Sequence, residues 1–137
     1  MAYLENYMNN NGDNIYVFFR ICIGALFFML GLQKLLGLWG MPGGPAVLGT
    51  LVWYAGIFEI MIGMALVFGV LTRPASFFGV IMMLVAYYLG HVTVGGWNPA
   101  QNMGMAALVF GLAFLLTFAF GAKKASLEKT VFGKEIF

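Results

Sequence analysis

The sequence has very little charge. Of its 137 residues, 9% are charged and 62% are hydrophobic, and the mean hydropathy is +0.92. A soluble domain carries about 25% charged residues, and a chain this apolar cannot hide its surface from water. We therefore expect the lipid bilayer to be its solvent. The few basic residues form no stripe with interleaved aromatics, so nucleic acid is not expected as a partner.

Cysteine and histidine are almost missing. Cys22 is the only cysteine, which excludes an intramolecular disulfide and a CxxC redox pair. His91 is the only histidine, so two histidines of one chain cannot ligate a haem, and zinc lacks a set of ligands. We expect no metal site and no covalently bound cofactor. A bound quinone is possible.

Four apolar segments have about the 20 residues that a helix needs to cross a bilayer. Glycine and proline separate the first two, and Arg73-Pro74 marks a turn between the second and third. The predicted fold is all-α: one membrane domain over 1–137, a four-transmembrane-helix bundle with a polar N-terminal segment 1–14 and a polar C-terminal tail 122–137. The four helices are expected at about 15–38, 50–71, 75–95 and 102–121.

Basic residues are absent from the two loops 39–49 and 96–101. Basic residues lie instead on the opposite side, among them Arg20, Arg73, Lys123 and Lys124. We expect these four side chains to contact lipid phosphates and to fix the topology. Cytoplasmic segments carry the excess of Lys and Arg. The sequence therefore predicts that both termini are cytoplasmic, an N-in/C-in topology.

Lys34, Glu59 and His91 are ionisable residues inside apolar stretches. A charge at bilayer depth costs roughly 2.5–3.5 kcal/mol on insertion scales, so such residues usually have a partner or a function. In the predicted topology all three lie in the outer half of the membrane, and Asn98 follows on the same side. Helical spacing also places Lys34 and Glu59 on faces with paired glycines, Gly24 with Gly31 and Gly56 with Gly63, where helices pack closely.

This outer-side cluster has two interpretations. Lys34 and Glu59 could form a structural ion pair that locks two helices together, or Lys34 could extend its stem to the interface. His91 could donate to a quinone carbonyl or relay a proton, or it could simply be bonded to a neighbouring helix. The sequence leaves both interpretations open.

The order of these residues resembles that of the DoxX family of small four-helix membrane proteins. The matching positions, within about 17–128, are Arg20, Gly31-Leu32-Gln33-Lys34-Leu35, Glu59, Gly63, Gly69-Val70-Leu71-Thr72-Arg73, His91, and Asn98 or Asn102. The resemblance implies a subunit of a membrane-associated oxidoreductase, such as the quinone-linked thiosulfate-oxidising type, or of a redox-stress complex.

Our leading hypothesis is a DoxX-like membrane subunit of a respiratory or redox complex. Its ligand would be quinone-like or a small anion, bound by Lys34, Glu59, His91 and Asn98. It would be an enzyme only as part of a membrane oxidoreductase. The alternative is a non-catalytic accessory or assembly subunit that packs against a larger membrane enzyme. Either way we expect the cell membrane of a prokaryote, with other membrane subunits or a second copy as partners. A transporter is less favoured, because no internal repeat is evident.

Overall fold

The computed structural model describes residues 2–134, and every regular element in this range is a helix. The long helices are α1 (Ala2–Leu36), α2 (Leu51–Phe68), α3 (Thr72–Tyr87) and α5 (Met105–Phe120). A π-helical turn, η1 (Tyr88–Val92), and the short α4 (Thr93–Gly95) prolong α3, and α6 (Leu127–Phe132) lies in the C-terminal tail. The predicted all-α class is confirmed.

In the part of the chain that the structure describes, three stretches are long and apolar enough to cross a membrane: Asn11–Leu36, Leu51–Phe68 and Thr72–Gly95. They correspond to the first three predicted segments. The fourth, α5, is apolar but has 16 residues, which gives about 24 Å of helix against a hydrocarbon core of about 30 Å. The structure thus has three to four helices compatible with a membrane bundle.

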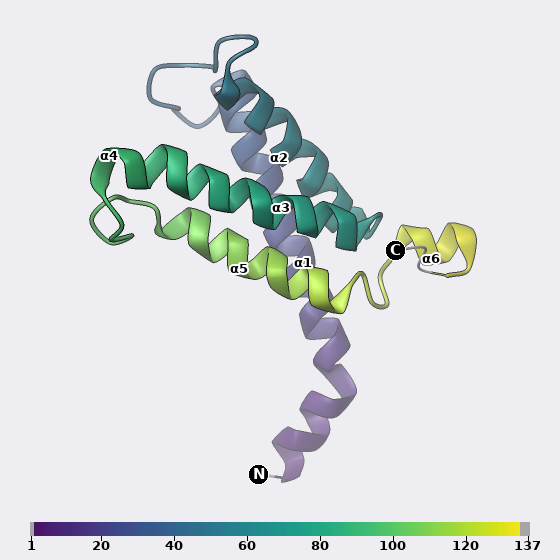
Figure 1. Ribbon diagram of the computed structural model, residues 1–137. Helices are drawn as coiled ribbons and strands as arrows, with labels where there is room; N and C mark the ends of the chain where they lie inside the picture. Colours follow the sequence, from purple (N-terminus) through teal and green to yellow (C-terminus); the bar gives the residue numbers. More distant parts are fainter. Residues whose placement is uncertain (1, 135–137) are drawn as a thin grey trace.

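The first helix is longer than the sequence predicts. α1 has 35 residues, which corresponds to about 52 Å at about 1.5 Å per residue. Most of the predicted polar segment 1–14 therefore continues the helix. In Figure 1 this N-terminal part of α1 extends alone, away from the other helices.

Close glycine contacts hold α1 against α2. A Cβ atom on Gly24 would lie 2.8 Å from the carbonyl oxygen of Gly63, and one on Gly31 would lie 2.6 Å from that of Gly56. Neither position has room for a side chain, so the backbones approach as the glycine spacing predicted. The two helices form one antiparallel hairpin.

The second hairpin consists of α3 and α5. Phe114 of α5 is fully buried and packs over Gly79 of α3, and the hydroxyls of Ser76 and Thr117 lie 2.7 Å apart between the two helices. The ring of Phe27 in α1 meets that of Phe114 edge-on, with centroids 4.7 Å apart. This aromatic contact joins the second hairpin to the first. Figure 1 shows α3 and α5 crossing in front of α1.

Arg20 fastens the C-terminal tail to α1. Its side chain is fully buried and donates to the carbonyl oxygens of Ala122, at 2.7 Å, and Ala125, at 2.6 Å. Nearby, the Tyr16 hydroxyl donates to the Gly121 carbonyl at 2.6 Å. Arg20 thus donates to backbone carbonyl oxygens inside the protein and does not contact the lipid phosphates that we expected.

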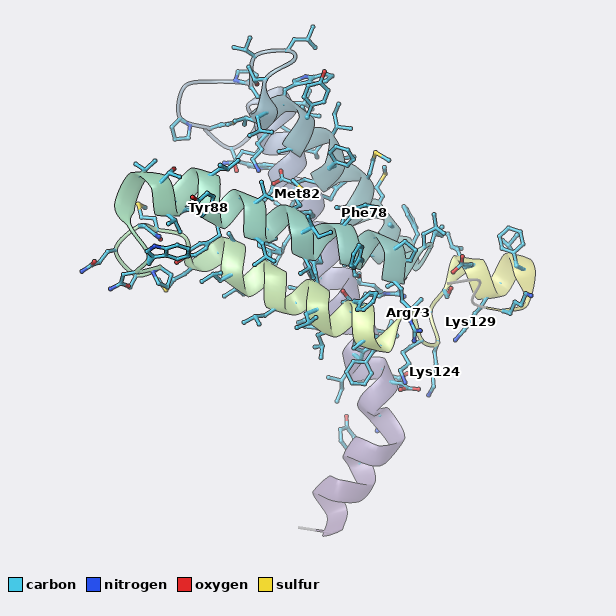
Figure 2. The ribbon with its side chains drawn as sticks, in the orientation of Figure 1. Arg73, Phe78, Met82, Tyr88, Lys124 and Lys129 are labelled. Carbon is cyan, nitrogen blue, oxygen red and sulfur yellow. The ribbon has the colours of Figure 1, made fainter. Side chains whose placement is uncertain are left out.

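The other basic residues lie nearer the surface. Lys123 forms an ion pair of 3.4 Å with Asp13 of α1, whereas Arg73 and Lys124 are exposed. Figure 2 shows Arg73, Lys124 and Lys129 gathered around the end of α5 and the start of the tail. At this end of the molecule α2 turns into α3 and α5 turns into the tail, so the two hairpins meet here.

Candidate functional site

Lys34 and Glu59 form an ion pair across the first hairpin. Lys34 lies in the last turn of α1, and its ammonium group donates to Oε1 of Glu59 in α2. The Glu59 side chain is 2% exposed and that of Lys34 is 28% exposed. Glu59 Oε2 is also buried, and no hydrogen-bond partner reaches it within the described part of the chain. The carboxylate therefore depends on Lys34 for its compensation.

His91 lies in the π-helical turn that ends α3. Its Nδ1 is 2.9 Å from the backbone oxygen of Asn102. A carbonyl oxygen only accepts hydrogen bonds, so Nδ1 carries the proton, and Nε2 of the neutral ring is an acceptor. A π-helical turn widens the helix by one residue and is frequent at functional sites. Here it sets the position of the one imidazole.

Aromatic and amide contacts hold this turn. The Tyr87 ring stacks on His91 with centroids 6.4 Å apart, and its hydroxyl donates to the Trp97 carbonyl at 2.6 Å. The Asn102 amide donates to the Gly96 carbonyl at 2.7 Å, while its side-chain oxygen accepts from the Gly104 amide at 2.8 Å. The loop after α4 is thereby folded back onto the histidine.

A cavity of about 530 Å³ lies between α2 and α3. This volume is within the range of about 300–1,000 Å³ that small-molecule sites occupy. The residues that line it come from the end of α1, the first half of α2, and the second half of α3 with η1: Lys34, Leu51, Val52, Tyr54, Ala55, Phe58, Glu59, Met82, Val85, Ala86, Leu89, Gly90 and His91. The lining is thus apolar apart from three ionisable groups and one tyrosine.

The structure brings three of the four predicted site residues together. Lys34, Glu59 and His91, from three different helical segments, all border this cavity. Asn98 does not line it; this residue is exposed, and its side-chain oxygen accepts from the Ala100 amide at 3.1 Å. The asparagine that contacts His91 is Asn102, through its backbone.

Sequence reasoning did not identify the apolar wall of the cavity. Tyr54 and Phe58 are four residues apart in α2 and share its cavity-facing side. Spacing indicates that they share a face, but lipid-facing residues have the same spacing. Within residues 2–134, no group of three or more His, Cys, Asp or Glu side chains lies close enough to hold a metal ion.

Comparison with known proteins identifies relatives of this chain. A family model described as DoxX matches residues 15–92, more than half of the chain. An uncharacterized protein of Haemophilus influenzae is 33% identical over 121 residues, which cover 85% of this chain and 90% of that protein. No solved structure matches the chain. The region matched by the family model contains Lys34, Glu59 and His91.

Proposed function

This chain belongs to the DoxX family, and on that premise we propose that it is a membrane subunit of a redox complex that binds a quinone between α2 and α3. The observation that carries the proposal is the convergence of Lys34, Glu59 and His91 on one cavity of about 530 Å³ with an otherwise mostly apolar lining. A flat, largely apolar ring with two polar oxygens suits such a site.

The polar groups have complementary roles in holding a ring. The Lys34 ammonium has three N–H donors, of which Glu59 Oε1 takes one, so donors are left for a quinone carbonyl. Nε2 of His91 can accept from the hydroxyl of the reduced ring. A bound quinone would supply the electron-carrying ring. Glu59 orients Lys34.

A small anion is the less suitable ligand. The Glu59 carboxylate borders the same cavity, and its negative charge already balances the positive charge of the Lys34 ammonium group. A like charge close by in a medium of low dielectric constant disfavours a second negative group. The site therefore favours a neutral ligand.

The chain would lie in the plasma membrane of a prokaryote with both termini in the cytoplasm. A bacterial relative supports the first statement. The cytoplasmic position of the termini is supported by Arg73 and Lys124, which lie at the end where the hairpins meet (Figure 2), and by Lys123, which pairs with Asp13. The loops 39–49 and 96–101, in contrast, have no Lys or Arg.

A second candidate function is a non-catalytic assembly subunit, with Lys34 and Glu59 as a structural clamp. The observation that favours it is the position of the pair beside a close approach of α1 and α2. A Cβ atom on Gly56, one helical turn from Glu59, would lie 3.2 Å from Cβ of Lys34. In this role the chain would pack against a larger membrane enzyme, and the cavity would hold lipid only.

The test is purification in a mild detergent, followed by native mass spectrometry for bound quinones and protein subunits together. The wild type is expected to retain a quinone, whereas His91→Ala should lose most of it. Asn98→Ala is the matched control, because it removes a polar side chain outside the cavity. Circular dichroism establishes that each variant is folded. Equal quinone content in the wild type and a folded His91→Ala would defeat the assignment.

A further inference from the structure

The cavity opens sideways between α2 and α3. Several of the side chains that line it are also exposed at the surface: Tyr54 (51%) and Phe58 (51%) on α2, and Val85 (46%) and Leu89 (47%) on α3. All four belong to stretches that are long and apolar enough to cross a membrane. The medium they contact is therefore hydrocarbon, and the opening leads into the bilayer.

The lining of the cavity is polar at its buried end and apolar at its exposed rim. Glu59 is buried, and Lys34 and His91 are partly buried, whereas the exposed rim consists of Phe58, Val85 and Leu89 with Tyr54. Met82, also on the lining, lies on the edge of α3 that faces α2 in Figure 2. Such a site has a polar inner end and an apolar exit.

Both neighbouring loops are fastened at the end of the cavity nearest water. The amide of Ala46 donates to the carbonyl oxygen of Lys34 at 2.8 Å, which folds the loop after α1 back over the helix end. The contacts of Tyr87 with Trp97 and of Asn102 with Gly96 fold the loop after α4 in the same way. The exposed lining residues run along α2 from Leu51 to Phe58 and along α3 and η1 from Val85 to Leu89.

We propose that the ligand is an amphiphile that enters from the lipid phase between α2 and α3. Its polar ring lies at Lys34 and His91, and its hydrocarbon chain leaves between Phe58 and Val85 into the bilayer. The inference rests on the proposed function and specifies it further: the lateral opening, lined by Phe58, Val85 and Leu89, selects a ring that carries a chain. The continuity of the rim with the ionisable groups favours such a ligand over a helix from a second copy.

The experiment uses the full chain in lipid nanodiscs and two probes with one headgroup, a dimethoxy-methyl-benzoquinone with a decyl chain and the same benzoquinone without it. Binding is measured by quenching of tryptophan fluorescence in the wild type and in Val85→Trp, which fills the opening. The matched control is Val109→Trp, an exposed position on α5 that does not line the cavity. It corrects for the added tryptophan and for partition of the decyl probe into lipid.

The expected result is that Val85→Trp weakens binding of the decyl probe by about tenfold or more relative to the control, while the chainless probe changes by less than about threefold. An equal change for both probes, or no change, would overturn the lateral opening but leave the quinone site in place. Absence of saturable binding of either probe to the wild type would overturn the quinone site itself, and the inference with it. A dimer of the wild type that Val85→Trp dissociates would show that a second copy occupies the opening.

Discussion

Lys34 and Glu59 are 25 positions apart in sequence and meet as an ion pair between the two helices of one hairpin. The carboxylate is almost fully buried, and its ammonium partner is not. Removing the lysine therefore leaves a buried charge with no other protein partner within the described chain. Removing both partners leaves an apolar contact. These two cases have very different energetic consequences.

We expect Lys34→Met to lower the free energy of unfolding by about 3–5 kcal/mol, because a buried ion pair that loses one partner leaves an uncompensated charge. Lys34→Met combined with Glu59→Met should recover most of this loss. The measurement is unfolding in mixed micelles of increasing sodium dodecyl sulfate content, followed by circular dichroism.

The same double variant separates the two proposed functions. If the pair is only a clamp, a folded double variant keeps its partner subunits. If the pair belongs to the ligand site, the double variant folds but loses quinone. A single Lys34→Met protein as stable as the wild type would contradict the buried pair.

Arg20→Leu is expected to release the C-terminal tail. The substitution removes the donors to the carbonyl oxygens of Ala122 and Ala125, and hydrogen bonds from a charged group contribute about 1.5–3 kcal/mol each. Trypsin cleavage after Lys124 in detergent should become at least about tenfold faster, because the tail opens more often. Arg73→Leu, at an exposed position, is the control. Equal cleavage rates in the two variants would show that Arg20 does not hold the tail.

The sequence predicted those features that depend on spacing along one helix. Glycines seven residues apart share a helix face, and so the contacts of Gly24 with Gly63 and of Gly31 with Gly56 could be expected. The convergence of Lys34, Glu59 and His91 also followed from their depth in antiparallel helices.

Features that depend on contacts between residues far apart in the sequence were not predicted. Arg20 is placed by the tail about a hundred residues later, and no local pattern indicates that contact. The π-helical turn at His91 depends on Tyr87, Trp97 and Asn102 meeting in space. Asn98 and Asn102 are four residues apart, and only the folded loop shows which one reaches the histidine.

Two glycine substitutions test the packing of the first hairpin. In Gly31→Ala the new methyl group would lie 2.6 Å from the Gly56 carbonyl oxygen and 2.7 Å from a side-chain carbon of Ile60. We expect a loss of about 1–3 kcal/mol in unfolding free energy, because the helices must move apart. In Gly111→Ala the methyl group lies 3.5 Å from Met83 Cβ, an ordinary contact.

Gly111→Ala should therefore be neutral or stabilise the protein by up to about 1 kcal/mol, since alanine favours the helix over glycine. Unfolding of Gly31→Ala and Gly111→Ala in the same micelle titration checks both predictions. A Gly31→Ala protein with wild-type stability would mean that α1 and α2 are not in close contact at this position.

Single cysteines test the topology and, with it, whether the 16-residue α5 crosses the membrane. In a Cys22→Ala background, Asn98→Cys and Lys124→Cys place thiols at exposed positions on either side of α5. A membrane-impermeant maleimide added to intact cells should label the first and not the second, and both should react after permeabilisation. Tyr7→Cys, exposed on α1, should behave like Lys124→Cys if both termini are cytoplasmic. Labelling of both Asn98→Cys and Lys124→Cys from outside would instead mean that α5 does not cross. In that case the tail would lie on the outer side and could not contact Arg20, which lies toward the cytoplasmic end of α1.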